Sequence, residues 1–167
     1  MAKKKYKNGE EYYNKIYTLF NLSVAITLLP FGYLVLEKHS GDLVSMPIDE
    51  WKHWVISLPV VIALGWIMWR SQQNFKEDKK AAKSVEGLRN KLDAFQQLLS
   101  RRFAIYTGIG AVCTMMLYLT GSGLFIMAYV ASMILLSLSR PTLNLIIDEL
   151  GLSEEEEKII MEKREIE

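Results

Sequence analysis

The stretch from Arg101 to Arg140 constrains the fold more than any other part of the sequence. Arg101 and Arg102 open it, and no charged side chain follows until Arg140. Between them lie two apolar runs of about 18 residues, and a helix of that length crosses a hydrocarbon core of about 30 Å. Gly121-Ser122-Gly123 separates the runs and is typical of a tight turn. We therefore expect a transmembrane hairpin with helices at about 103–120 and 123–139.

Two further apolar runs precede this hairpin, at about 16–36 and 54–69. Tyrosines stand at the beginning of the first, and tryptophans flank the second at both ends, where aromatic rings prefer the headgroup level of a bilayer. The basic N-terminus could belong to a signal peptide, but the following run has no small-x-small cleavage site before Pro30 and is long enough to span a membrane. A retained first helix is therefore expected.

The bases are concentrated on one predicted side of the membrane. The N-terminal arm and the 71–102 connector are rich in Lys and Arg, the loop between the first two spans has two lysines, and the hairpin turn has none. Because an excess of Lys and Arg marks the cytoplasmic side, both termini and the connector are expected to be cytoplasmic, with the protein in the inner membrane. Four spans satisfy this arrangement.

The resulting fold class is an all-α integral membrane protein, a four-transmembrane-helix bundle. Its expected organisation is a basic cytoplasmic arm, a transmembrane domain that includes the connector, and a cytoplasmic acidic helical tail, over residues 1–15, 16–140 and 141–167, respectively.

The connector shows apolar residues in alternating three- and four-residue steps, and no proline interrupts its path into the third span. This pattern predicts one helix of about 35 residues with a short heptad-like stripe. The stripe could pair with an extension of the second span or with another subunit, or the basic face of the connector could lie on anionic lipid. We favour protein pairing, and the candidate partner-docking residues are Val85, Leu88, Leu92, Phe95 and Leu99.

The tail contains signals for two short helices. Pro141 suits the first turn of one helix and Gly151 suits its left-handed end, while Ser153 and Glu156 form the capping box of the next. Nine acids against three bases follow Arg140, a balance that repels nucleic acid phosphates and favours docking on the basic connector or on a partner.

The middles of the four spans contain no Asp, Glu, Lys, Arg or His, so proton relays and charged substrate pathways are disfavoured. Small and polar residues instead follow helical faces. These faces could hold the bundle together, line a pore or join subunits. The candidate helix-interface or pore-lining residues are Asn14, Thr18, Asn21, Ala104, Thr107, Gly108, Ala111, Thr114 and Ser132.

The sequence provides weak evidence for chemistry. His39 and His53 share a loop with several acids, but the spacing supports only one metal-ligand pair, so their metal binding stays open. Cys113 lies in a span with no neighbouring base to activate it. We expect no catalytic residue, cofactor or metal. The expected function is non-enzymatic assembly, as a homo-oligomer or accessory subunit of a membrane complex, and the alternative is an oligomeric channel or carrier for an ion or small solute.

Overall fold

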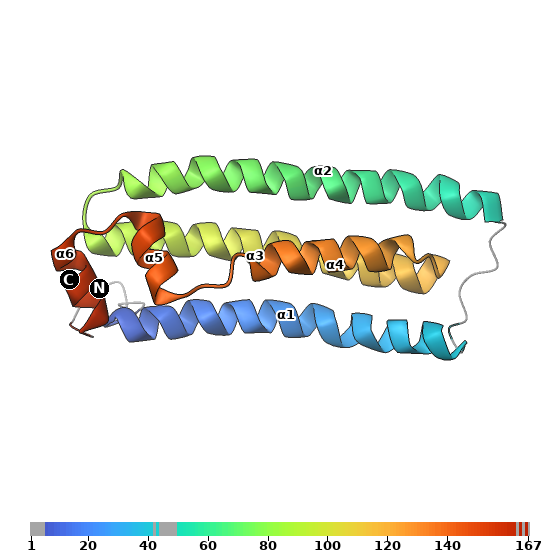
Figure 1. Ribbon diagram of the computed structural model, residues 1–167, viewed down its shortest axis with the longest axis horizontal. Helices are drawn as coiled ribbons and strands as arrows, with labels where there is room; N and C mark the ends of the chain where they lie inside the picture. Colours follow the sequence, from blue (N-terminus) through green and yellow to red (C-terminus); the bar gives the residue numbers. More distant parts are fainter. Residues whose placement is uncertain (1–5, 42, 44–49, 163, 165, 167) are drawn as a thin grey trace, which may run out of the picture. The chain divides into compact units, whose positions relative to one another are not determined.

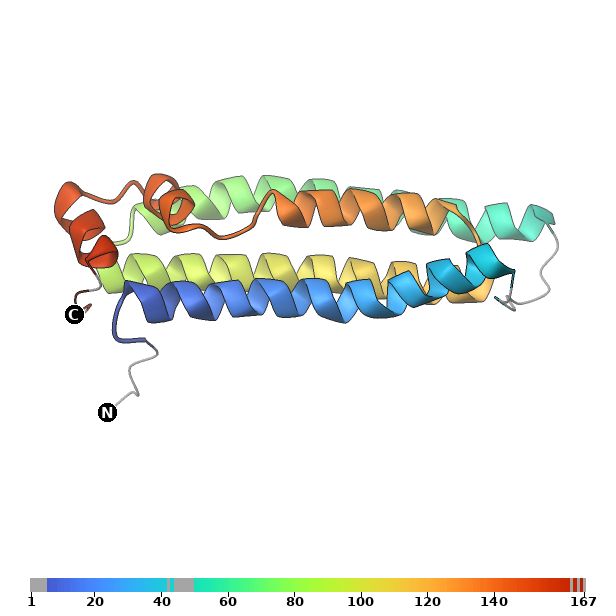
Figure 2. The same ribbon diagram turned by 60° about the horizontal axis from the view of Figure 1, so that its bottom comes forward.

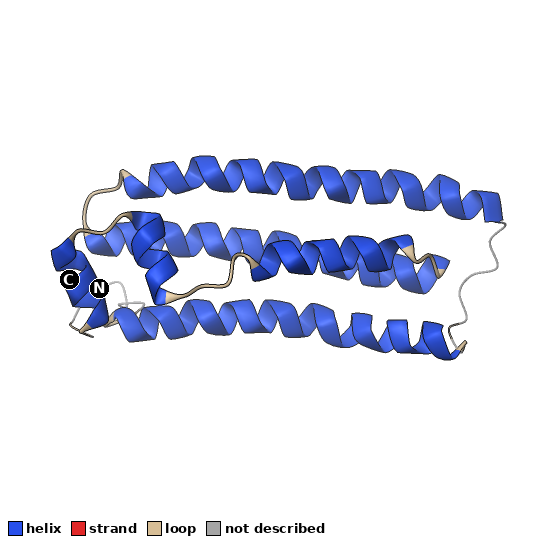
Figure 3. Ribbon diagram, in the orientation of Figure 1, coloured by secondary structure: helices blue, strands red, loops and turns tan. Residues whose placement is uncertain are grey.

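The computed structural model describes residues 6–41, 43, 50–162, 164 and 166, which contain six helices and no strand (Figures 1 and 3). The predicted all-helical class is confirmed for this part of the chain. The helices are α1 (Gly9–Ser40), α2 (Glu50–Lys83), α3 (Leu88–Thr120), α4 (Leu124–Ser137), α5 (Leu143–Leu150) and α6 (Glu154–Met161).

The chain divides into two compact units, each made of segments that are distant in sequence. Unit 1 comprises residues 1–21, 73–102 and 140–167, and unit 2 comprises residues 22–72 and 103–139. Helices α1, α2 and α3 each contribute one part to unit 1 and the other part to unit 2.

In the part of the chain that the structure describes, three helices are long enough and apolar enough to cross a membrane, namely α1, α2 and α3. They have 32, 34 and 33 residues, respectively, so each continues beyond its apolar run into polar sequence. The predicted continuous helix from the connector into the third span is confirmed by α3. Helix α2 extends further than its expected span because residues 70–83 contain no proline or glycine and include many good helix formers.

The α3–α4 turn uses one of its two glycines for a left-handed conformation. Gly121 has φ of 63°, whereas Gly123 has φ of −63° and needs no glycine-specific freedom. The ammonium group of Lys38 donates a hydrogen bond to the Gly121 carbonyl oxygen, and a cation there suits the negative end of α3. Helix α4 has only 14 residues and is apolar along its length.

Unit 1 has its own core, built largely from aromatic and aliphatic side chains. Tyr12 is almost fully buried, and its hydroxyl donates a 2.8 Å hydrogen bond to the Leu92 carbonyl oxygen. Tyr6 donates to the carboxylate of Asp93 at 3.1 Å, and Arg89 donates back to the Tyr6 carbonyl oxygen at 3.0 Å. These contacts attach residues 6–12 to the first turns of α3.

The tail is part of unit 1, and Figures 1 and 2 show α5 and α6 beside the first turns of α3. Gly151 is left-handed with φ of 58°, and Ser153 and Glu156 form the complete capping box, as the sequence predicts. The placement of Pro141 in the first turn of a helix is wrong. Thr142 is the N-cap of α5 because its hydroxyl accepts from the Leu145 N–H, so Pro141 precedes the helix.

In unit 2, α1, α3 and α4 meet closely at Gly110. A Cβ added at Gly110 of α3 would lie 2.8 Å from Thr27 Cγ2 and 3.4 Å from Tyr129 Cε2. Tyr129 also stacks on Phe31, with ring centroids 3.6 Å apart and planes 11° apart. Only a residue without a side chain fits this contact, so Gly110 permits the approach of α3 to α1.

We predict that Gly110→Ala destabilises the fold by about 1–3 kcal/mol because the new methyl group overlaps Thr27. Gly108→Ala is the matched control on the same helix, since a Cβ there meets nothing within 4 Å. The measurement is thermal unfolding in a mild detergent. Equal melting temperatures for the two variants would show that the Gly110 contact does not limit packing.

Candidate functional site

The small-residue face of α3 is largely open. Ala104, Gly108 and Ala111 are exposed, and Thr107 and Thr114 are half-buried. The Thr114 hydroxyl donates to the Gly110 carbonyl oxygen at 2.8 Å, so it is satisfied within its own helix. The structure therefore leaves Ala104, Gly108 and Ala111 uncovered, whereas the two threonines are partly covered.

An apolar groove of about 340 Å³ adjoins this face. It lies between α1 and α3, and its walls are Ile26, Thr27, Pro30, Leu34, Ala111, Thr114, Met115 and Tyr118. Its lining contains only two hydroxyl-bearing threonines and one tyrosine and no ionisable carboxylate or base. The groove has the chemistry of a surface that faces hydrocarbon or another apolar helix.

The other predicted interface residues lie in different environments. Asn14, Thr18 and Asn21 are exposed on the part of α1 that belongs to unit 1. Ser132 of α4 is fully buried in unit 2, and its hydroxyl donates to the Tyr129 carbonyl oxygen at 2.7 Å. Ser132 therefore contributes to the interior, and it shares no surface with the exposed α3 face.

The predicted docking stripe of the connector is mostly core of unit 1. Leu92, Phe95 and Leu99 are 0%, 1% and 2% exposed, whereas Val85 and Leu88 are half-buried. Other buried apolar residues of this unit come from α5, α6 and the C-terminal end, namely Ile146, Ile147, Leu150, Ile160 and Ile166. The central part of the stripe is thus covered by the chain itself.

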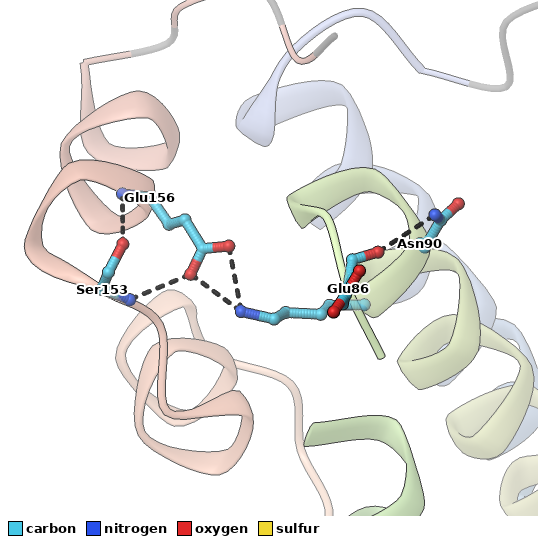
Figure 4. Close-up of polar contacts among 5 residues, drawn as sticks. Glu86, Asn90, Ser153 and Glu156 are labelled. Carbon is cyan, nitrogen blue, oxygen red and sulfur yellow. Dashed lines mark hydrogen bonds and ion pairs between the residues drawn. The ribbon is translucent and has the colours of Figure 1, made fainter. Parts of the chain in front are cut away.

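Charged residues of the tail pair with the connector. Lys91 of α3 contacts both carboxylate oxygens of Glu156 at 3.0 Å, and the same carboxylate accepts from the Ser153 backbone N–H (Figure 4). A second ion pair joins Lys79 of α2 to Glu149 of α5. Partly exposed ion pairs contribute at most about 1 kcal/mol each, so the buried apolar side chains contribute most of the attachment of the tail.

Three residues that the sequence analysis did not select hold unit 1 or unit 2 together. Besides Gly110, Arg102 is buried, with its guanidinium 4.1 Å from the ring centroid of Phe75. Gly9 packs against α6, because an added Cβ would lie 2.8 Å from the Ile160 carbonyl oxygen. Phe75, an isolated apolar residue in a basic segment, was the available signal for the Arg102 contact, and nothing local indicates the Gly9 contact.

The histidines do not share a ligand cluster in the described chain. No group of three or more His, Cys, Asp or Glu side chains converges among residues 6–41, 43, 50–162, 164 and 166. His39 is exposed and His53 is half-buried, while Asp42 and Asp49 lie outside the described residues. Cys113 is fully buried in unit 2.

The Lys91–Glu156 contact predicts a pH dependence. Burial acts to raise the pKa of Glu156, but the hydrogen bond from the Ser153 N–H and the Lys91 ammonium group outweigh it, so the pKa lies below the ordinary value of 4.5. A carboxylate with a lowered pKa in the folded state stabilises that state above its unfolded pKa, and this contribution is lost as the pH falls through the folded value.

We predict that Glu156→Gln weakens the attachment of α6 at neutral pH by about 1 kcal/mol or less. The variant should also show a smaller weakening of this attachment below pH 4.5, because glutamine has no carboxylate to protonate. Glu155→Gln is the matched control, because Glu155 is exposed on the same helical turn. Hydrogen exchange of the α6 amides from pH 7 to pH 3 provides the measurement. Identical profiles for both variants would contradict a role for the Lys91 contact.

Comparison with known proteins identifies no relative: no model of a protein family, no curated protein and no solved structure matches this chain.

Proposed function

We propose that the protein is an integral membrane protein with unit 2 embedded in the bilayer. Among the residues that the structure describes, all the exposed large apolar side chains except Met161 belong to unit 2. An apolar exterior of this extent is costly in water and suits lipid. The charge-free intervals of α1 (16–36), α2 (53–69) and α3 (103–120) have lengths of about 31, 26 and 27 Å, which match a hydrocarbon core of about 30 Å.

A fourth crossing by α4 completes the proposed bundle. Its 14 helical residues span about 21 Å, less than a typical transmembrane helix. Non-helical residues on both sides, Gly121–Gly123 and Leu138–Ser139, lengthen the uncharged segment. What supports the crossing is connectivity, because the α3–α4 hairpin leaves unit 1 after Arg102 and rejoins it at Arg140.

The proposed orientation places unit 1 on the cytoplasmic side of the inner membrane, together with both termini. Its support is the excess of Lys and Arg in the N-terminal arm and the connector. The 37–52 segment, in contrast, contains only two lysines, Lys38 and Lys52.

Within the membrane the protein acts by assembly, as a homo-oligomer or as an accessory subunit of a larger complex. The observation that carries this proposal is the exposed face of Ala104, Gly108 and Ala111. In lipid, helices associate through close packing, and small residues allow their backbones to approach. The face has the required residues, and the chain does not cover it.

The alternative of a channel or carrier has less support. The hydroxyl groups of Thr27, Thr114 and Ser132 in unit 2 donate to carbonyl oxygens of their own helices, and so are not free to form a polar path. Flux measurements in proteoliposomes separate the two functions: a solute-specific leak that Asn21→Leu abolishes would favour transport over assembly.

We predict that Gly108→Leu weakens self-association by at least about tenfold, since the added side chain separates the facing helices. A side chain fits at Gly108 of a single chain because its Cβ position is open, so the melting temperature of the monomer should not fall. Sedimentation in mild detergent measures the oligomeric state.

Ala131→Leu is the control for this experiment, because Ala131 is an exposed small residue of unit 2 on α4. It should leave association unchanged. A wild-type protein that stays monomeric at high concentration, or equal effects of the two leucines, would contradict assembly through α3.

A further inference from the structure

A cluster of hydrogen-bond donors lies where α1 passes near Arg140, in the segment between α4 and α5. Tyr13, Tyr17 and Asn21 recur at four-residue spacing and so lie on one side of α1. The Tyr13 and Tyr17 rings stack, with centroids 5.5 Å apart. Arg140 approaches this side of the helix, with its guanidinium 5.7 Å from the Tyr17 ring centroid.

The Tyr17 hydroxyl contacts the charged member of the cluster. Arg140 Nη2 donates a hydrogen bond to Tyr17 Oη at 3.4 Å, and Asn21 follows one turn further along the same side of α1. A phenol oxygen that accepts from a guanidinium still has its own hydrogen to donate. Arg140 cannot accept this hydrogen, because the guanidinium group of arginine has no acceptor.

The cluster carries an uncompensated positive charge. Within the part of the chain that the structure describes, Arg140 has no carboxylate partner. The sequence around it contains no acid from residue 12 to 36 or from residue 94 to 147. Arg140 and Asn21 are both exposed, so an anion can reach them from outside the protein.

The donor set matches the chemistry of a phosphate group. A guanidinium offers a planar pair of N–H donors that fits phosphate oxygens, and a hydroxyl and an amide beside it can contact the remaining oxygens. Arg140 is also the first charged residue after the apolar stretch that begins at Phe103. On the proposed membrane placement, which this inference depends on, Arg140 lies at the level of the lipid headgroups.

We propose that Arg140, Tyr17 and Asn21 bind the phosphodiester of an anionic phospholipid. The absence of acids from the sequence around the cluster favours an anionic headgroup over a zwitterionic one, because the amine of a zwitterionic lipid would need a carboxylate partner. On the proposed membrane placement, the partner of this site is a lipid of the surrounding leaflet.

Arg70 provides a matched control. It is an exposed arginine at the end of the charge-free interval of α2, and its guanidinium lies 5.5 Å from the ring centroid of Trp66. Like Arg140, Arg70 is positively charged and lies beside an aromatic ring. The ring beside Arg70, however, offers no hydroxyl or amide to a phosphate group. A non-specific effect of interfacial charge would appear equally at Arg70 and Arg140.

The test is native mass spectrometry of the full-length protein in non-ionic detergent, titrated with phosphatidylglycerol or phosphatidylcholine. The wild type should bind phosphatidylglycerol preferentially. Arg140→Gln should weaken this binding by about tenfold and Tyr17→Phe by a few-fold, since each loses a hydrogen bond to a charged group. Arg140→Lys should fall between wild type and Arg140→Gln because it keeps the charge and loses the planar fork. Arg70→Gln should change binding less than twofold.

Three results would overturn the proposal: equal losses in Arg140→Gln and Arg70→Gln, equal binding of the two lipids, or displacement of the lipid by inorganic phosphate at matched concentration. The last would identify a site for a free anion. Circular dichroism of each variant confirms the helical fold, and Tyr17→Phe tests the cluster without altering charge. The oligomeric state measured in parallel keeps the outcomes separate, because a wild type that associates but shows no preference for phosphatidylglycerol contradicts only the lipid site.

Discussion

The sorting of charge along three continuous helices is the constraint on which the other features of this protein depend. In α1, α2 and α3, a charge-free interval is joined without interruption to a polar segment of the same helix. A helix satisfies its backbone hydrogen bonds internally, so one element can continue from hydrocarbon into water while only its side chains change. The boundary between the two units lies within two residues of this change at residues 72, 102 and 139, whereas at residue 21 it lies inside the charge-free interval of α1.

The two units are held together by different interactions. Unit 2 depends on close approach of backbones, as at Gly110 against Thr27, and on ring stacking between Phe31 and Tyr129. Such contacts suit lipid, where burying apolar surface provides little drive for helix association. Unit 1 has a core of buried aliphatic and aromatic side chains of the kind found in water-soluble domains. Its ion pairs at Lys79 and Lys91 add specificity to the docking of the tail more than they add stability.

Helix positions and helix ends could be predicted from the sequence because they depend on local chemistry. The charge-free runs, the uninterrupted path into α3, the left-handed Gly151 and the Ser153–Glu156 capping box all depend on neighbouring residues. The α5 cap was misplaced because proline is compatible with the positions just before a helix as well as its first turn, and the Thr142 hydroxyl decides between them.

The inward and outward faces could not be predicted in the same way. Gly108 and Gly110 are both small and two residues apart, yet Gly110 is buried against Thr27 and Gly108 is open. Periodicity shows which residues share a face, but it does not show which face meets another helix. The contact of Gly9 with Ile160 joins positions about 150 residues apart and has no local signal. The surface assigned to assembly is therefore the part of the proposal that depends most on the three-dimensional arrangement.

The placement of unit 2 in a bilayer can be tested directly with the four tryptophans of the chain, which are all on α2. Trp51, Trp54, Trp66 and Trp69 are between 57% and 64% exposed, and the two pairs are about 18–27 Å apart along the helix axis. Fluorescence quenching by lipids brominated at defined depths measures where their indoles lie. In reconstituted bilayers, bromines near the headgroups should quench strongly and bromines near the bilayer centre weakly. Absence of quenching at every depth, or strongest quenching at the centre, would contradict the proposed membrane placement.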